Sequence, residues 1–182
     1  MTTDSQINAI HAIGYSNSEG RFLRLVALHS GYFLRRQVLL ALGCRPGKRS
    51  QEFIEELIRR RHASREVYRK DRHIFRLQSK IIYDALGQED NRNRREHQPS
   101  TVRLRLMALD YVLEHPDHQY LVTPNEKLSY FFEERKIDPG AFPARIFRSN
   151  NFLTTRYFAD GFPQFLNERD RHVVSFVYVD DN

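Results

Sequence analysis

Cationic side chains are concentrated in one short stretch of the sequence. Residues 57–77, LIRRRHASREVYRKDRHIFRL, contain eight Lys or Arg and two His in twenty-one positions. Sixteen Lys or Arg stand against eight Asp or Glu in residues 1–87, and thirteen stand against fifteen in residues 88–182. Clustered Lys and Arg side chains neutralise phosphate groups. The charge pattern therefore predicts a phosphate-binding first half joined to a more neutral second half.

Two aspartates in the second half have positions that suit a divalent metal. Asp160 precedes one predicted strand and Asp180 ends the next, which loosely resembles the Mg²⁺-binding acids of restriction-endonuclease-like cores. That pattern also has a lysine two residues after the second acid, whereas Asp181 and Asn182 follow here. A metal-dependent nuclease is therefore the alternative function, and we expect no enzyme activity, metal or cofactor.

Other chemistry finds little support in the sequence. The single cysteine, Cys44, has no partner for an internal disulfide, and there is no glycine-rich phosphate loop or nucleophile elbow. The sequence has no run of eighteen apolar residues, and MTTDSQINAI lacks the basic start and apolar stretch of a secretory signal. We therefore expect a cytoplasmic protein with no membrane partner.

The first half predicts three helices and a hairpin. Ser16 to Ser18 provide N-caps for a helix that stops at Gly31, and residues 34–42 follow as a short second helix. Ser50 is expected to cap a third, amphipathic helix. In residues 63–77 the apolar period changes to two, which predicts a hairpin with a basic tip.

Three short helices followed by a hairpin is the order of a winged helix-turn-helix, in which the third helix enters the major groove of DNA. The segments GYFLRRQVLLALG, FIEELIRRRHA and HIFRL resemble the winged-helix part of bacterial regulators and of plasmid replication-relaxation proteins. The resemblance covers the first half of the chain. It implies that the third helix reads base edges and that the hairpin touches the phosphate backbone.

The DNA-binding residues expected from this arrangement fall into two groups. Base contacts are expected from the start of the third helix, at Arg45, Lys48, Arg49 and Gln51. Phosphate contacts are expected from the second helix and the hairpin tip, at Arg35, Arg36, Arg69, Lys70 and Arg72. For Arg59, Arg60 and Arg61, DNA contact and pairing with Glu55 or Glu56 both remain open.

The sequence also predicts where the domains divide. Residues 88–100 have no apolar side chain except the ring of Pro99, so they are expected to form a linker between domains 1–87 and 101–182. In the second domain Ser100 is expected to cap a helix that ends near His115, and Thr123 another.

Strands are expected beyond Pro143. Residues 154–166 and 172–181 are expected to form a hairpin in which Val173–Val179 is a central strand. Because that strand ends the sequence, we expect the second domain to be truncated at its C-terminus.

The sequence as a whole predicts an α+β protein with an N-terminal winged helix-turn-helix and a smaller mixed α/β domain. We expect a sequence-specific double-stranded-DNA-binding protein that acts as a transcriptional regulator or a plasmid or mobile-element maintenance factor. The apolar helix after Ser100 also suits a homodimer contact, and residues 101–182 a protein partner. A winged helix that binds protein rather than DNA is the remaining alternative.

Overall fold

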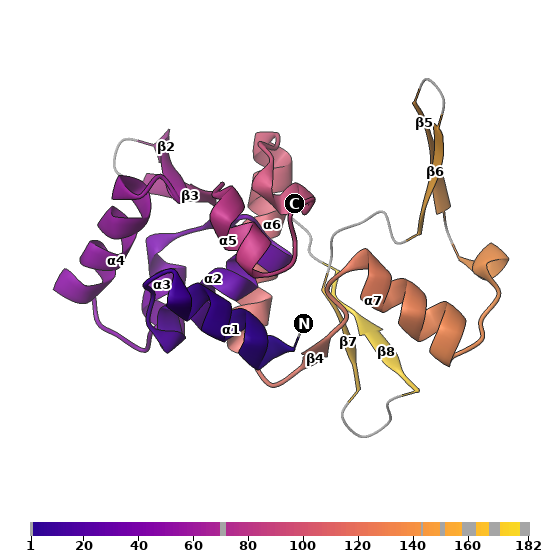
Figure 1. The fold of residues 1–182 in the computed structure, drawn as a ribbon. Coiled ribbons are helices and arrows are strands. Elements are labelled where there is room, and N and C mark those ends of the chain that lie inside the picture. The colour runs from indigo at the N-terminus through magenta and orange to yellow at the C-terminus, as the bar shows by residue number, and fades with distance from the viewer. Residues whose placement is uncertain are drawn as a thin grey trace. The chain divides into compact units, whose positions relative to one another are not determined.

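The computed structural model describes residues 2–69, 72–142, 144–149, 152–157, 163–167 and 172–178. The chain forms two compact units, of which the first ends at Pro116 and the second is Asp117–Tyr178. Helices and small antiparallel sheets occur together (Figure 1), so the expected α+β class is confirmed. None of the helices in these ranges is both long and apolar enough to cross a bilayer.

The first unit contains most of the helices and one three-stranded sheet. In chain order its elements are α1 (Thr3–Ala12), α2 (Asn17–His29), β1 (Tyr32–Phe33), α3 (Arg35–Ala41), α4 (Lys48–Arg59), β2 (Ala63–Arg69), β3 (Arg72–Leu77), α5 (Lys80–Ala85), η1 (Arg92–Arg94) and α6 (Pro99–Glu114). The expected three helices and hairpin are α2, α3, α4 and β2–β3. Helix α1 and strand β1 are additions that the sequence did not predict.

Capping chemistry sets where the helices begin. The Ser16 hydroxyl accepts the Glu19 N–H while the Glu19 carboxylate accepts the Ser16 N–H, and this capping box starts α2. The N-cap Ser16 is among the caps that the sequence predicts, whereas the part of Glu19 was not predicted. Helix α4 begins at Lys48, ahead of the expected cap Ser50. Ser50 is buried inside the helix, where its hydroxyl donates to the Gly47 carbonyl oxygen at 3.0 Å. The prediction that Ser50 is a cap was therefore wrong.

The sheet of the first unit has the antiparallel order β1-β3-β2. Phe33 pairs with Phe75, and Ala63 pairs with Leu77. Because alternate residues of a strand point to the same face, Phe75 and Leu77 both reach the core. The predicted hairpin is confirmed, with its strands at the expected residues.

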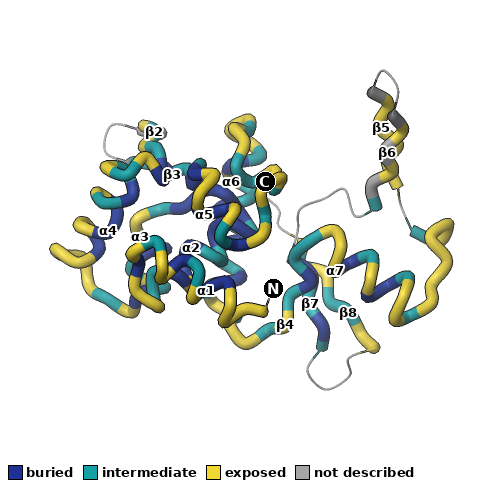
Figure 2. Tube along the Cα trace, viewed as in Figure 1, coloured by how far each residue is buried: buried dark blue, intermediate teal, exposed yellow. Residues whose placement is uncertain are grey.

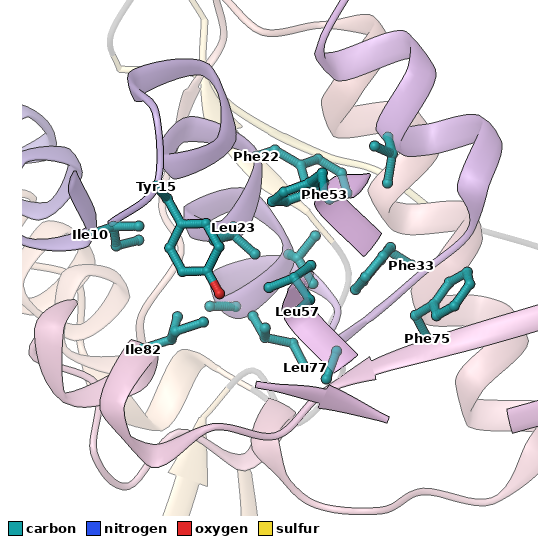
Figure 3. Packing of buried hydrophobic residues seen from close by; sticks show 14 of the residues in the cluster. Ile10, Tyr15, Phe22, Leu23, Phe33, Phe53, Leu57, Phe75, Leu77 and Ile82 are labelled. Atoms are coloured by element: carbon teal, nitrogen blue, oxygen red, sulfur yellow. The ribbon is translucent and has the colours of Figure 1, made fainter. Parts of the chain in front are cut away.

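The core of the first unit fixes α4 to the other helices and to the sheet. Figure 3 shows Phe53 and Leu57 of α4 among Phe22 of α2 and Phe33 of β1. The Phe22 ring meets the rings of Phe33 and Phe53 edge to face, with centroids 5.4 and 6.1 Å away. Each buried side chain of this size contributes about 1.5–3 kcal/mol to folding. The apolar face of α4 is therefore firmly held.

Helix α6 belongs to the first unit. Val102 and Leu106 pack with Tyr32 and Ile74, and Leu109 joins the main core. The apolar stripe of α6 is thus covered by residues of β1 and β3. The division of the chain lies after Pro116 rather than within residues 88–100. The helix also starts earlier than expected, at Pro99 after the N-cap Gln98.

Residues 88–98, which we call the strap, lie against the first unit. The Asn93 amide donates to the carbonyl oxygens of Ala27 and Leu28 at 2.9 and 2.8 Å. The Arg105 guanidinium of α6 in turn donates to the Asn93 side-chain oxygen. Polar hydrogen bonds, rather than apolar burial, therefore dock a segment that the sequence predicts to be a linker.

The second unit is a small α+β assembly. Its elements are β4 (Gln119–Tyr120), α7 (Pro124–Leu128), the π-helical turn η2 (Ser129–Glu134), η3 (Pro139–Ala141), β5 (Ala144–Ser149), β6 (Phe152–Tyr157), β7 (Gln164–Leu166) and β8 (Val174–Phe176). The predicted capping box at Thr123 is confirmed, with Glu126 as its second member. Leu121, Tyr130, Phe131 and Leu166 form its core.

The strands of the second unit differ in part from the prediction. Strands β7 and β8 pair as the expected hairpin, but β7 lies between β4 and β8. Among the described strands, the one expected to be central is therefore at an edge. Phe176 of β8 is accordingly exposed. Strand β6, which holds Thr154–Tyr157, pairs with β5 instead. Asp160 and Asp180 lie outside the described residues.

Candidate nucleic-acid interface

Helix α4 presents a group of polar side chains at its N-terminal end. Lys48, Arg49 and Gln51 are exposed there, and Arg45 is exposed in the preceding turn. Figure 2 shows buried and exposed positions alternating along α4, as its amphipathic pattern requires. No side chain caps this helix and its first turn has no acid, so the N-terminal N–H groups favour a nearby anion. The four residues expected to contact bases therefore share one exposed end of α4.

The exposed polar residues of α4 also contact one another. Lys48 lies 3.5 Å from Glu52, and the Gln51 amide donates to the Glu55 carboxylate at 2.8 Å. The Lys48 side chain is 88% exposed. An ion pair this exposed stabilises a helix by less than about 1 kcal/mol, so it exchanges readily for a stronger partner. These side chains thus remain able to accept another ligand.

The C-terminal end of α4 is occupied by a tighter cluster. Arg59 donates to the Glu56 carboxylate at 2.8 and 2.6 Å, and Arg60 donates to it at 2.5 Å. Hydrogen bonds from Arg59 and then Arg60 lower the pKa of Glu56 to about 2. Arg60 also donates to the Ile13 carbonyl oxygen at 2.7 Å. Two of the three arginines left open by the sequence are therefore paired, with Glu56 as partner, while Arg61 is exposed.

A buried hydrogen bond joins the end of α4 to the turn before α2. The Tyr15 hydroxyl and the His62 Nδ1 atom are 2.6 Å apart. Burial raises the pKa of Tyr15 to about 12 and lowers the pKa of His62. Both groups are therefore neutral at pH 7, and the phenol donates to the imidazole. This bond sets the position of the chain where it leaves α4 and enters the hairpin.

The two arginines at the start of α3 have different surroundings. Arg36 forms a bidentate pair with Asp110 of α6, with both N–O distances 2.5 Å. Hydrogen bonding to Asp110 raises the pKa of Arg36 further. Arg35 is exposed and makes no ion pair with a described residue. Both arginines were expected to contact phosphate. Arg35 is available for such a contact, whereas Arg36 is paired with the Asp110 carboxylate.

The hairpin carries the remaining expected phosphate contacts. Lys70 lies outside the described residues, as do the side chains of Arg69 and Arg72. Nearer the core, the Arg76 guanidinium of β3 lies 3.3 Å from the Glu66 carboxylate of β2. Arg65 is exposed, with its guanidinium 5.9 Å from the centre of the Phe75 ring. Arg65 is therefore an exposed cation of the described part of the hairpin.

Sequence reasoning missed the residues that fix α3 in place. Gln37 is fully buried, and its amide nitrogen donates to the Leu106 carbonyl oxygen at 2.9 Å and to Asp110 at 2.8 Å. Its amide oxygen accepts the Leu34 N–H at 2.8 Å. No spacing in the sequence pairs Gln37 with Asp110, which lies 73 positions away. Such long-range partners are visible only after folding.

The part of the chain that the structure describes contains no candidate metal site. There, no three His, Cys, Asp or Glu side chains gather closely enough to hold a metal ion. Cys44 is a free, half-buried thiol. No protein-family profile, curated protein or solved structure matches the chain.

Proposed function

We propose that residues 17–77 form a winged helix-turn-helix and that the chain binds double-stranded DNA in a sequence-specific manner. In this assignment α3 and α4 are the helix-turn-helix pair, α4 is the recognition helix and β2–β3 is the wing. The element order α2, β1, α3, α4, β2, β3 and the sheet order β1-β3-β2 support it. The excess of cations in residues 1–87 supports a phosphate-bearing partner.

The exposed N-terminal end of α4 is the observation that carries the proposal. A recognition helix contacts base edges with its N-terminal residues. Arg45, Lys48, Arg49 and Gln51 are exposed at that end, while the opposite face of α4 is fixed in the core. Arginine and lysine pair with guanine, and glutamine pairs with adenine. The chemistry and the exposure of these side chains therefore support the assignment of base readout to α4.

The proposed phosphate contacts come from around the recognition helix. Arg35 and the wing residues Arg69, Lys70 and Arg72 would capture the DNA backbone, and base readout by α4 would follow. Arg36 is assigned a positioning role, because it holds α3 on Asp110. We assign dimer or partner contacts to Asp117–Tyr178, as in a transcriptional regulator or a plasmid or mobile-element maintenance factor.

Selection of bound sequences from a random duplex pool, followed by salt titrations on the selected duplex, tests the proposal. Joint replacement of Arg69, Lys70 and Arg72 by Ala should weaken binding to every sequence and reduce the salt slope by about 2–3. Arg49→Ala and Gln51→Ala should each change base preference by about 1–3 kcal/mol.

Lys80→Ala removes an exposed cation from α5 and serves as the control, with no change expected. Failure of the unmodified chain to bind any duplex at low salt would overturn the proposal. If the wing variants and the α4 variants both lost the same affinity on every DNA sequence, the proposed separation between phosphate contact by the wing and base readout by α4 would be overturned.

The balanced charge of α4 favours a second candidate, a winged helix that binds a protein. Glu52, Glu55 and Glu56 accompany Lys48, Arg49 and Arg59 along the helix, so its surface is not strongly cationic. Mixed charge suits a polar protein surface, where complementary patches set specificity. This candidate predicts that the chain ignores duplex DNA at moderate salt and that Lys48→Glu abolishes capture of a protein partner.

A further inference from the structure

A two-stranded ribbon projects from the second unit. Among the described strands, β5 and β6 pair only with each other, over six residues each. At roughly 3.4 Å per residue, such a ribbon is roughly 20 Å long. Figure 1 shows it extending away from α7 and from β7 and β8. A two-stranded ribbon alone is at best marginally stable in water, so this one depends on what holds its base and on what it contacts.

The base of the ribbon is fixed to the core of the second unit. The Tyr157 ring at the end of β6 meets the Phe132 ring edge to face, with centroids 5.0 Å apart. Phe142, two residues before β5, packs against the rings of Phe131 and Phe132 with centroids 5.0 and 5.6 Å away. Phe131 is itself part of the core. The ribbon is therefore anchored at one end and is held out from the core along the rest of its length.

Beyond its base, the ribbon exposes cations and apolar side chains together. All the side chains from Ala144 to Arg148 are exposed. Ile146 and Leu153 are 66% and 68% exposed. Arg145 and Arg148 make no ion pair with a described residue. Large apolar side chains that are exposed as a group usually mark a surface that contacts a partner.

The ribbon has no acidic side chain. Residues 144–157 contain Arg145, Arg148 and Arg156 and no Asp or Glu. The register sets Arg145 opposite Arg156, and like charges opposite each other destabilise a pair of strands. An anionic partner compensates this charge, whereas a second copy of the same ribbon would add to it. The charge therefore favours an anionic partner and disfavours pairing between two copies of the chain.

The cations lie on both faces of the ribbon. Because alternate residues of a strand point to the same face, Ile146 and Arg148 share one face while Arg145 and Phe147 share the other. Leu153 pairs with Arg148 and lies on its face. An element that lies on a lipid surface separates an apolar face from a cationic one. The major groove of DNA instead places base edges, including the thymine methyl group, between two phosphate walls, and it admits a two-stranded ribbon. The mixed faces therefore favour DNA over lipid.

We propose that the β5–β6 ribbon is a second DNA-binding element, which lies in a groove of the duplex with its arginines on phosphates and Ile146 and Leu153 against base edges. The two-stranded form of the ribbon suits a groove, and its exposed arginines suit the phosphates beside it. The proposed function gives Asp117–Tyr178 only contacts with protein, so the ribbon adds a DNA contact to this unit. The inference rests on the proposed function only in taking duplex DNA as the partner, because its residues are separate from those of α3, α4 and the wing.

Fluorescence-anisotropy titrations of the full chain with the selected duplex and with an unrelated duplex test the contact. Joint replacement of Arg145 and Arg148 by Gln should lower affinity for both duplexes about tenfold at about 0.1 M salt and reduce the salt slope by about 2, because two phosphate contacts are lost. Joint replacement by Lys keeps the charge and should keep the slope. Lys136→Gln removes an exposed cation of the same unit outside the ribbon and should change neither quantity.

Amide signals locate the contact independently of the wing. In the ¹⁵N-labelled full chain with Arg69, Lys70 and Arg72 replaced by Ala, addition of duplex at low salt should still shift the amide signals of Ile146 and Leu153. The same spectra show that the variants are folded.

The outcomes separate this inference from the proposed function. If the double Gln variant matched Lys136→Gln in affinity and slope, the ribbon would not contact DNA and the proposed function would stand. If the ribbon variant lost affinity while the wing and α4 variants did not, the ribbon would be supported and the winged-helix assignment overturned.

Two further outcomes would identify another partner and overturn the inference. The first is loss of binding to phosphatidylglycerol vesicles by the double Gln variant without loss of binding to duplex, which would identify a lipid surface. The second is a shift of the ribbon signals with protein concentration in the absence of DNA, which would identify a second copy of the chain.

Discussion

Gln37 is the side chain through which α3 is fixed to α6. It is fully buried and makes three hydrogen bonds, to Leu34, Leu106 and Asp110. We expect Gln37→Leu to lower the free energy of unfolding of the first unit by about 2–4 kcal/mol, because the Leu34 N–H is left unpaired and the clamp is lost. Urea denaturation followed by circular dichroism at 222 nm measures this loss.

Arg36→Leu is the matched control for Gln37→Leu. It removes a hydrogen-bonding side chain from the same clamp, but the Arg36 side chain is 61% exposed. The loss should stay within about 1 kcal/mol, since exposed ion pairs contribute little. A larger loss for Arg36→Leu than for Gln37→Leu would mean that the ion pair, rather than the buried amide, fixes α3.

Lys127 is a buried lysine, and the amount by which its charge destabilises the folded state should depend on pH. It is 7% exposed, and burial lowers its pKa from 10.5 to about 8. Below pH 8 the lysine is charged in both states and the folded state bears the full desolvation cost. One pKa unit corresponds to about 1.4 kcal/mol, so the lowering of the Lys127 pKa from 10.5 to about 8 represents a desolvation cost of about 3 kcal/mol. Between pH 8 and 10.5 the folded state loses its proton first, so the free energy of unfolding should rise.

Lys127→Met should remove this dependence. We expect the variant to be about 1–3 kcal/mol more stable than the unmodified chain at pH 7, because it keeps an apolar stem without a charge to desolvate. The gain should shrink as pH approaches 10. Thermal unfolding at pH 7 and pH 10 measures both, with Lys136→Met, at an exposed position, as the control. A gain of the same size at both pH values would exclude desolvation as the cause.

The strap makes a prediction at the scale of elements. Gly31 has a φ of +80°, and a Cβ added there would collide with the backbone carbonyl of Asn93 in the strap. Gly43 has a φ of +57° but open space around the same position. Gly43→Ala should therefore cost only the conformational penalty of about 1–2 kcal/mol. Gly31→Ala should cost more and should increase amide hydrogen exchange across residues 88–98.

The comparison of Gly31→Ala with Gly43→Ala separates the effect of the strap contact on stability from the effect of backbone strain. Both replacements force an alanine into the left-handed region, so only the contact with Asn93 differs. If both variants lost the same stability and Gly31→Ala left the hydrogen exchange of the strap unchanged, the close contact between Asn93 and Gly31 would not be needed to hold the strap in place.

Elements with local signals could be predicted from the sequence. The candidate N-caps Ser16 to Ser18 mark the start of α2, and the alternation of apolar residues in 63–77 marks the hairpin. Helix α1 was missed because its signal is weak: within Thr3–Ala12 only Ile7 and Ile10 are buried apolar side chains. Local patterns thus identify strongly amphipathic or capped elements and overlook weak ones.

Partners of elements could not be predicted in the same way. The apolar stripe of α6 predicts a helix, but its covering residues Tyr32 and Ile74 come from strands far away in the sequence. At the candidate interface, exposure of Lys48 and Arg49 follows from the amphipathic pattern of α4, whereas the capture of Arg36 by Asp110 spans 74 positions. A polar composition in residues 88–98 likewise indicates exposure without revealing hydrogen-bonded docking.

At the scale of the whole molecule, α6 decides which fragment can fold. A fragment of residues 1–116 keeps α6 over Tyr32 and Ile74, whereas a fragment of residues 1–98 exposes both. Loss of α6 removes five buried residues, Val102, Leu106, Ala108, Leu109 and Val112. At about 1.5–3 kcal/mol for each large apolar side chain, the loss exceeds about 6 kcal/mol, which is comparable with the entire stability of a small domain.

We therefore expect fragment 1–116 to fold and fragment 1–98 to remain largely unfolded, although the polar composition of residues 88–100 suggests a boundary there. Amide spectra with wide dispersion and a cooperative urea transition should be seen for 1–116 alone. If the proposed function is correct, 1–116 should also bind the selected duplex, since it contains every residue of the proposed winged helix-turn-helix. A well-dispersed spectrum from 1–98 would show that α6 is dispensable and that the first unit is complete without it.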